Sequence, residues 1–262
     1  MKLSISNIAW SAEMDQEVYN RMAEMGYTGL EIAPTRIFPD HPYEHPEEVS
    51  VWSASLKGRY GFMVSSMQSI WYGRTERIFG EPQETAFLEE YTCKAVGFAV
   101  AAGCRNLVFG CPKNRALPEN GDPEGALAFF DKIGRYAQEK NCVIAMEANP
   151  PIYHTNFINT TQQAIGFVQQ MDCPGLLLNL DVGTMVENEE SVRILKGHEG
   201  KIHHVHISEP GLAPLQKRKI HEELADFLKN ADYKGFISIE VKKTEDMDDL
   251  WHMMEYVKDI FG

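Results

Sequence analysis

Eight short apolar segments recur along the chain, and each is followed by a turn and an amphipathic segment. The apolar segments cover residues 2–10, 29–34, 62–70, 105–111, 142–149, 176–183, 202–208 and 235–242. Apolar runs of this length are typical of strands buried on both faces, and strands that alternate with helices form a parallel sheet. Eight such units close most simply into a (β/α)8 barrel, although an open doubly wound sheet would give the same pattern.

The length of the chain agrees with one barrel. Its 262 residues match the roughly 250 residues typical of a single barrel, and no Gly/Ser-rich or Pro-rich linker divides them. We therefore expect one α/β domain, a TIM barrel that spans residues 1–262. No glycine-rich phosphate-binding motif follows the first apolar segment, which argues against a dinucleotide-binding sheet.

Charge and cysteine content narrow the classes of partner. A net charge of -13 works against binding to the phosphate backbone, so we expect no nucleic-acid partner. The five cysteines never form a CxxC pair, as is usual in a reducing compartment. The sequence has no apolar run long enough for a membrane span and no secretory leader, so we expect a cytoplasmic protein that does not contact membranes. The apolar face of residues 247–257 belongs to the core or to a subunit contact, which leaves a homo-oligomer open.

Four side chains that commonly bind metals stand near the ends of the last four apolar segments. They are Glu147 in CVIAMEAN, Asp181 in LLLNLDVG, His206 in IHHVHISE and Glu240 in FISIEVKK. Their separations of 34, 25 and 34 residues are those of equivalent positions in neighbouring β/α units. In a barrel, all four would therefore arrive at the same end of the sheet.

Such a group of acids requires a compensating charge. Three carboxylates at close range repel one another and would be partly protonated without a cation. A ligand set of three oxygens and one nitrogen favours Mn²⁺, Mg²⁺ or Co²⁺, with Zn²⁺ as an alternative. The sequence therefore predicts one divalent metal ion, bound by Glu147, Asp181, His206 and Glu240.

The motifs MEAN, NLDVGTM, HVHISE and ISIE give the chain a resemblance to known proteins. It resembles the xylose isomerase-like TIM barrels, specifically the sugar phosphate isomerase/epimerase family that includes ketose 3-epimerases of the D-tagatose 3-epimerase type. The resemblance implies the same four metal ligands and makes Glu147 and Glu240 an acid–base pair on opposite faces of a sugar. It implies an isomerase or epimerase of a small carbohydrate that works through a metal-stabilised enediolate.

Three positions depart from the ketose 3-epimerase pattern. Where those enzymes carry a substrate-binding histidine, a further acid and an arginine, this chain has Thr184, Tyr153 and Ala213. These departures put a free ketohexose in doubt as the substrate. We expect a modified or anionic sugar instead.

Six further residues are candidate substrate contacts. Trp10 and Gln68 end the first and third apolar segments, and His204 shares the inward face with His206. Lys113 and Arg115, in GCPKNR, would lie on a loop at the active face and could hold a phosphate or carboxylate. Glu209, three residues after His206, could orient a ligand or the substrate. For each residue, a purely structural role is the alternative.

Two other residues carry expectations about orientation. Glu31 in GLEIAP is expected to face inward or to pair with a cation such as Arg36 or Lys113. His203 is expected to point away from His206 and to pack among helices.

Other activities remain open on the same sequence. The main alternative is a metal-dependent dehydratase, since an enediolate can also expel a β-hydroxyl group. Apurinic endonucleases share this type of barrel, but the acidic charge and the absence of a histidine at Thr184 count against DNA repair. A sugar-binding protein without catalysis is disfavoured because both Glu147 and Glu240 are present.

Overall fold

Eight parallel strands form a closed barrel in the computed structural model, which describes residues 1–262. Each strand pairs with the next one in the chain, and β8 pairs with β1. The strands are β1 (Lys2–Ser6), β2 (Gly29–Ile32), β3 (Met63–Met67), β4 (Asn106–Phe109), β5 (Val143–Glu147), β6 (Leu176–Asp181), β7 (Ile202–Ile207) and β8 (Phe236–Ile239). The predicted parallel barrel is confirmed, and the open doubly wound sheet is excluded.

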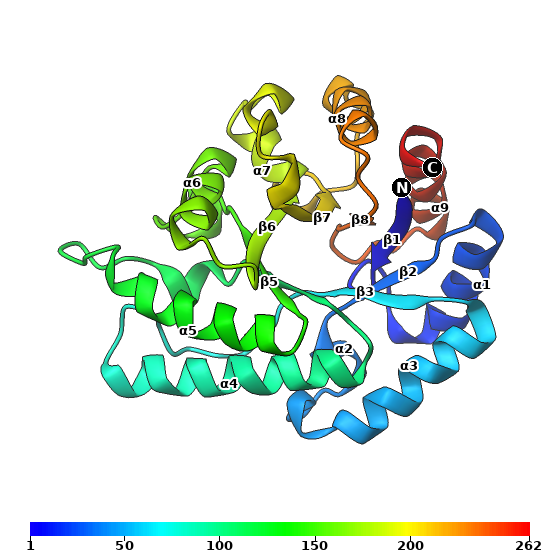
Figure 1. Ribbon diagram of the computed structural model, residues 1–262. Coiled ribbons are helices and arrows are strands. Elements are labelled where there is room, and N and C mark those ends of the chain that lie inside the picture. Colours follow the sequence, from blue (N-terminus) through cyan, green and yellow to red (C-terminus); the bar gives the residue numbers. More distant parts are fainter.

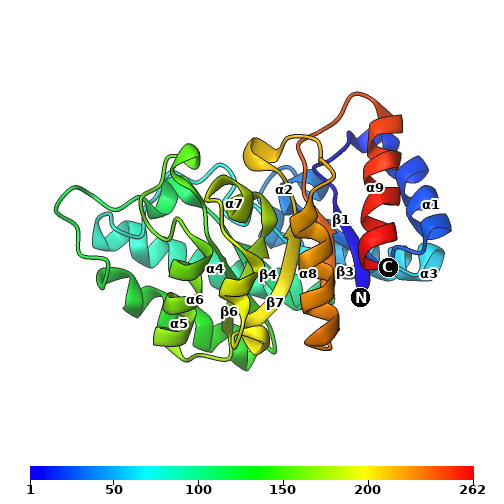
Figure 2. The same cartoon turned by 90° about the horizontal axis from the view of Figure 1, so that it is seen from above.

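Helices surround the barrel, and the two ends of the chain lie beside each other where α9 packs near β1 (Figures 1 and 2). The helices are α1 (Asp15–Met25), α2 (Pro34–Ile37), α3 (Pro46–Tyr60), α4 (Pro82–Ala101), α5 (Gly125–Glu139), α6 (Thr161–Met171), α7 (Val182–Glu187), α8 (Lys219–Asn230) and α9 (Met247–Phe261). Short 3-10 turns cover Ala12–Met14, Pro42–Glu44, Pro112–Arg115, Pro151–Tyr153, Val192–Leu195, Glu199–Lys201 and Pro210–Leu212. None of the helices combines the length and the apolar character needed to cross a bilayer.

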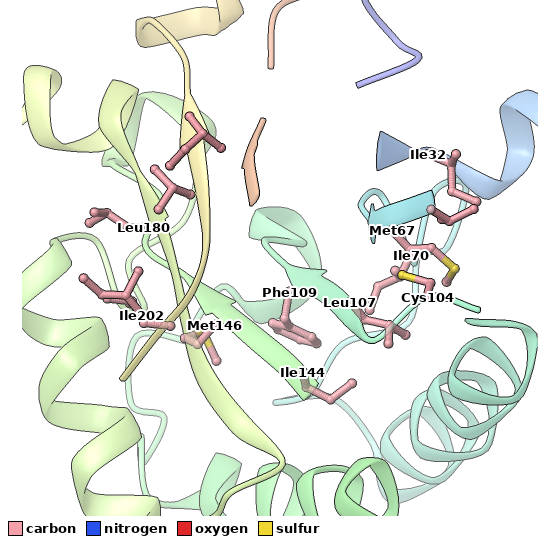
Figure 3. Packing of buried hydrophobic residues seen from close by; sticks show 14 of the residues in the cluster. Ile32, Met67, Ile70, Cys104, Leu107, Phe109, Ile144, Met146, Leu180 and Ile202 are labelled. Carbon is pink, nitrogen blue, oxygen red and sulfur yellow. The ribbon is translucent and has the colours of Figure 1, made fainter. Parts of the chain in front are cut away.

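Alternate residues of each strand face opposite sides of the sheet, and the two sides differ sharply in polarity. Outward residues such as Phe109 and Met146 pack against the helices (Figure 3). The ring of Phe109, for example, makes an edge contact with Phe130 of α5, with 4.9 Å between ring centroids. Burial of this outer layer is the main stabilising contribution to the fold.

Inward positions are largely polar. The buried inward side chains include Ser4, Ser6, Glu31, Ser66, Asn106, Asn179, His204 and Ser238. Polar groups buried in this way need partners inside the barrel, and several find them on a neighbouring strand. The amide of Asn106, for example, donates to Ser66 Oγ over 2.8 Å. The interior is therefore a hydrogen-bonded network that leads up to the open end.

A β-bulge in β7 changes which side chains enter this network. The pairing of β6 with β7 runs from Leu178 opposite Ile202 directly to Asn179 opposite His204, so His203 is an extra residue. Its side chain faces inward, where Nδ1 lies 2.6 Å from Asn106 Oδ1. The expectation that His203 packs among helices is therefore wrong, because strict alternation fails at a bulge.

Candidate metal-dependent active site

The four predicted metal ligands meet at the carboxyl end of the barrel. Glu147 and Asp181 are the last residues of β5 and β6, His206 lies near the end of β7, and Glu240 directly follows β8. One ligand atom from each lies within 4.8 Å of the others. The group is almost fully enclosed: His206 is 0% exposed, and the other three are buried or nearly so. The parallel strands bring together residues that are far apart in sequence.

The His206 ring stands between the two glutamates. Its Nδ1 atom lies 3.1 Å from Glu147 Oε1 and 3.2 Å from Glu240 Oε2. Amide groups fix Glu147 further, since Asn179 donates to Oε1 over 2.7 Å and Asn149 donates to Oε2 over 2.9 Å. Both oxygens of Glu147 are thus oriented by neighbours before any ligand is added.

Asp181 is held in a different way, at the start of α7. The backbone N–H of Thr184 donates to Oδ1 over 2.6 Å, as in a helix N-cap, and the hydroxyl of Ser208 donates to Oδ2. The hydroxyl of Thr184 donates to the carbonyl of Ala148 over 2.8 Å. Thr184 is therefore used to connect loops and is 1% exposed, so it offers no group to a substrate.

The acids of the site perturb one another's proton affinity. Burial, and then the charge of Glu147, raises the pKa of Asp181 to about 6. Burial likewise raises the pKa of Glu240 to about 7, although His206 opposes the rise. Burial also acts to raise the pKa of Glu147, but the hydrogen bond and charge of His206 outweigh it and hold the value below its ordinary range. Burial acts to lower the pKa of His206, but the surrounding carboxylates raise it well above the ordinary value. The cluster thus carries an excess of negative charge that protons partly offset.

A cavity of about 150 Å³ opens directly above the cluster. Its lining residues are Gln68, Ser69, Val108, Gly110, Cys111, Pro112, Glu147, Asn149, Tyr153, Asp181, Leu212 and Glu240. No lysine or arginine is among them. The floor of the cavity is formed by the acidic residues Glu147, Asp181 and Glu240, and its walls are formed by the uncharged lining residues.

The backbone of three wall residues adopts a left-handed conformation. Ser69, Cys111 and Leu212 have φ values of 53°, 44° and 54°, in loops after three different strands. Such values are uncommon for residues other than glycine and concentrate at functional sites. The loop of Leu212 is held in place because its carbonyl accepts the N–H of Lys242 and the neighbouring Gly211 N–H donates to the Tyr153 hydroxyl over 2.9 Å. Tyr153 therefore connects two loops at the mouth of the cavity.

Gln68 and Trp10, two of the six candidate substrate contacts, lie in different places relative to the cavity. Gln68 lines the cavity, and its amide nitrogen lies 3.2 Å from Ser6 Oγ. Trp10 does not line it: the side chain is 1% exposed and its indole N–H donates to Asp15 Oδ1 over 2.8 Å. The expectation that Trp10 walls the pocket is corrected, because its ring packs into the apolar core.

The two cations expected on the active face do not reach the cavity. Lys113 is exposed and is not a lining residue. Arg115 is fully buried, and its guanidinium donates to the carbonyl of Glu147 over 2.8 Å and to Asn149 Oδ1 over 2.9 Å. Arg115 thus supports the strand end that carries Glu147 and is not free to hold a phosphate or carboxylate.

Glu209 is likewise bound to protein groups. It accepts two hydrogen bonds from Arg218 Nε, of 2.7 and 2.9 Å, and one of 2.6 Å from Nη2. The charge of Arg218, in the basic segment 216–219, is therefore neutralised. Glu209 orders the loop between β7 and α8 instead of meeting a substrate.

His204 lies beneath the cluster, away from the cavity. It is 1% exposed, and its Nε2 atom is 3.1 Å from Glu31 Oε2. Glu31 does face inward, but its partners are His204 and His206, whereas Arg36 pairs with Asp15 over 2.7 Å. His204 is thus placed to act on Glu31 and not on a substrate.

Two residues of the site were not singled out from the sequence: Asn149 and Ser208. Each stands two positions after a predicted ligand, Glu147 and His206 respectively. The period-two alternation of a strand places such residues on the same inward face, so this signal was present in the sequence.

Comparisons with known proteins agree with this architecture. A family model described as xylose isomerase-like TIM barrel matches residues 19–259. Curated protein sequences gave no significant match. Among solved structures, the chain is similar to D-psicose 3-epimerase from Clostridium cellulolyticum H10, with a TM-score of 0.81 and 16% identity over 100% of this chain and 99% of that one.

Two other solved structures widen the range of activities found on this fold. The 3-keto-D-glucoside 4-epimerase from E. coli has a TM-score of 0.79 and 18% identity, with 99% of both chains covered. The probable 3-DHS dehydratase from Bacillus anthracis has a TM-score of 0.70 and 16% identity, with 98% of both chains covered. At these identities the likeness establishes the fold, and the chemistry has to be argued from the site.

Proposed function

The chain belongs to the xylose isomerase-like TIM barrel family, and from this premise we propose that it is a metal-dependent isomerase or epimerase of a sugar or sugar derivative. The observation that carries the proposal is the convergence of Glu147, Asp181, His206 and Glu240 beneath a small cavity. Similarity to sugar 3- and 4-epimerases supports it.

The donor set fits one divalent cation. Ions bound at about 2.1 Å hold opposite ligand atoms about 4.2 Å apart, and the four ligand atoms here all lie within 4.8 Å of one another. Three carboxylates and one imidazole suit Mn²⁺, Mg²⁺ or Co²⁺, with Zn²⁺ as the alternative. When bound, the cation would supply Lewis-acid stabilisation of the charge that develops on substrate oxygens after a proton next to a carbonyl is removed.

Glu147 and Glu240 are the proposed proton-transferring groups. They approach the His206 ring from β5 and from the end of β8, and both line the cavity. One carboxylate takes the proton from the carbon next to the carbonyl. The other returns a proton to the opposite face for epimerisation, or the pair moves a proton between adjacent carbons for isomerisation.

The cavity favours a small, uncharged substrate. A volume of about 150 Å³ holds roughly ten water-sized groups, because one water requires about 10–15 Å³. This matches a monosaccharide or a similar compound. The acidic side chains at the base of the cavity and the absence of lining cations disfavour a substrate that carries a phosphate or carboxylate. The sequence led us to expect a modified sugar or an anionic sugar, and of these two we retain the modified, uncharged sugar.

A dehydratase is the second candidate, favoured by one contact as well as by the similar dehydratase structure. The Tyr153 hydroxyl already accepts the Gly211 N–H, so its own proton is free to point into the cavity. A donor there could protonate a departing hydroxyl group.

The proposal is tested with metal-loaded protein in D₂O. The substrates are a panel of uncharged keto sugars and keto-glycosides, each paired with its phosphate ester. We expect deuterium on the carbon next to the carbonyl, no change in the number of hydroxyl groups, and preference for the uncharged member of a pair. Loss of water would instead support the dehydratase. Turnover that is unaffected by removal of metal would contradict both candidates.

A further inference from the structure

We propose that Glu31 is a positioning residue of the metal site: it holds His206 through Nε2, so that Nδ1 faces Glu147 and Glu240. His204, two residues earlier on β7, lies beside the same carboxylate, with Nε2 3.1 Å from Glu31 Oε2. The inference rests on the proposed metal site and adds a residue from the opposite side of the barrel to it.

The geometry of the three side chains carries the inference. Glu31 Oε2 lies 2.8 Å from His206 Nε2 and 3.1 Å from His204 Nε2, and all three side chains are at most 1% exposed. A carboxylate can only accept, so His206 Nε2, which faces Glu31, must carry hydrogen. With one ring proton held on Nε2, Nδ1 is the nitrogen left for a metal ion, which would displace the second proton of the ring. That atom is 3.1–3.2 Å from the carboxylate oxygens of Glu147 and Glu240.

Glu31 has no other partner that explains its burial. Its second oxygen, Oε1, has no hydrogen-bond partner, and Arg36, the cation expected for it, pairs with Asp15. Loss of hydration strongly destabilises a buried carboxylate unless partners compensate it. The two imidazoles are the groups that compensate Glu31.

A separate metal site at Glu31, His204 and His206 is the alternative that this geometry disfavours. Ligands of a tetrahedral ion bound at about 2.0 Å lie about 3.3 Å apart. The 2.8 Å between Glu31 Oε2 and His206 Nε2 is shorter than that separation and is a hydrogen bond. Glu31 therefore fits a hydrogen-bonded support for His206 beneath the metal ligands.

Removal of such a supporting residue is expected to lower the affinity of the site for metal. Partners that orient metal-bound histidines typically contribute 10- to 100-fold to metal affinity. We expect Glu31→Gln to weaken Zn²⁺ binding by about this factor, because glutamine can still accept the Nε2 proton but lacks the charge. Glu31→Asp, which retains the charge on a shorter side chain, should bind Zn²⁺ more tightly than Glu31→Gln does.

The test compares Glu31→Gln with a matched control, Glu209→Gln. Glu209 is also a buried glutamate near the end of β7, but its partner is Arg218 and it touches none of the four ligands. Zn²⁺ binding is measured by calorimetry at pH 8, and thermal unfolding verifies that each protein is folded. Glu209→Gln should bind Zn²⁺ within about twofold of the wild type.

A spectroscopic readout separates positioning from a general structural role. In protein labelled with ¹⁵N-histidine and loaded with Zn²⁺, the wild-type His206 ring should show metal at Nδ1 and a hydrogen-bonded proton on Nε2. In Glu31→Gln the signal of that proton should move upfield as the charged acceptor is lost. This wild-type measurement remains decisive even if the variants fail to fold.

The outcomes distinguish this inference from the proposed function. If the wild type binds no divalent metal, the proposed function fails. If it binds Zn²⁺ through Nε2 of His206, or if Glu31→Gln binds with unchanged affinity and unchanged ring signals, the role of Glu31 is overturned while the metal site stands.

Discussion

The two halves of the barrel contribute different chemistry to the same cavity. Strands β5–β8 and their ends supply all four candidate metal ligands. Strands β1–β4 and the loops after them supply neutral inward groups such as Ser6, Ser66, Gln68 and Val108. The exception is Glu31 on β2, which reaches across the interior to His206. Charge is thus concentrated on one side of the mouth, and the other side forms a neutral wall.

The difference suggests how one fold accommodates several activities. The charged half is fixed by many internal hydrogen bonds, including those that Asn179 and Asn149 donate to Glu147. The neutral half contributes uncharged loop residues to the cavity wall, such as Ser69 and Cys111. We infer that the first half determines the reaction type and the second half the shape of the substrate.

The largest expected effect comes from the charged half. Glu147→Gln and Glu240→Gln should each reduce turnover by at least about 100-fold, because an amide can still offer an oxygen to metal but cannot accept the proton. The measurement is steady-state turnover of variants whose metal content has been verified. Near-normal turnover of either metal-loaded variant would remove that residue from the mechanism.

The next largest effect on turnover is expected where a loop of the neutral half packs closely against a ligand of the charged half. A Cβ atom at Gly110, in the loop after β4, would lie 2.8 Å from Glu147 Oε2. Gly110→Ala should therefore displace Glu147 and lower turnover by about 10- to 100-fold, since small misplacements of catalytic groups are costly.

A second glycine provides the control. Gly97→Ala in α4 meets no atom within 4 Å, and it should leave turnover unchanged and stabilise the helix by about 0.5–1 kcal/mol. Equal turnover of both alanine variants would show that the cavity wall tolerates movement of Glu147.

A smaller effect is expected at Gln68 on the neutral wall. Gln68→Ala should raise KM about two- to tenfold with little change in kcat, because one hydrogen bond contributes about 0.5–1.5 kcal/mol. Steady-state kinetics over a range of substrate concentrations gives both constants. A fall in kcat as large as that of Glu147→Gln would remove the distinction between the two halves.

The smallest expected effect is on the pH dependence of stability, and it comes from His221, a buried histidine outside the charged cluster. Burial lowers the pKa of His221, on α8, to about 4, so the folded protein keeps this ring neutral. The unfolded chain takes up that proton near pH 6.5, so His221 should lower stability as the pH falls from about 6.5 to about 4. Its contribution should be absent above that window.

The measurement is the midpoint of urea unfolding at pH 7 and pH 5. The decrease in midpoint should be smaller in His221→Gln than in the wild type. An identical decrease in both proteins would show that His221 titrates normally in the fold.

The sequence predicted the barrel and the convergence of four side chains because both follow from periodicity. A strand end recurs once per β/α unit, so Glu147, Asp181, His206 and Glu240 could be placed at one edge without knowing any contact. The same reasoning failed at His203, where a bulge shifts the face of one residue.

The surroundings of the site could not be predicted, because they depend on contacts between distant loops. Arg115 and Glu209 looked like free charges in the sequence, but the fold places partners beside each of them. The sequence left open whether Glu31 faces inward or pairs with a cation such as Arg36 or Lys113, and only the fold shows that it faces inward and lies against His206. Period and spacing locate the ends of strands but do not determine which side chains meet across the interior.

The most direct test of the central claim is the metal content of the wild type and of Asp181→Ala, each purified without chelator and shown to be folded. Asp181 is a ligand with no proposed part in proton transfer, so its removal tests the metal site alone. We predict one divalent ion per chain in the wild type and little or none in the variant. Equal metal content in both proteins, or none in the wild type, would contradict the account.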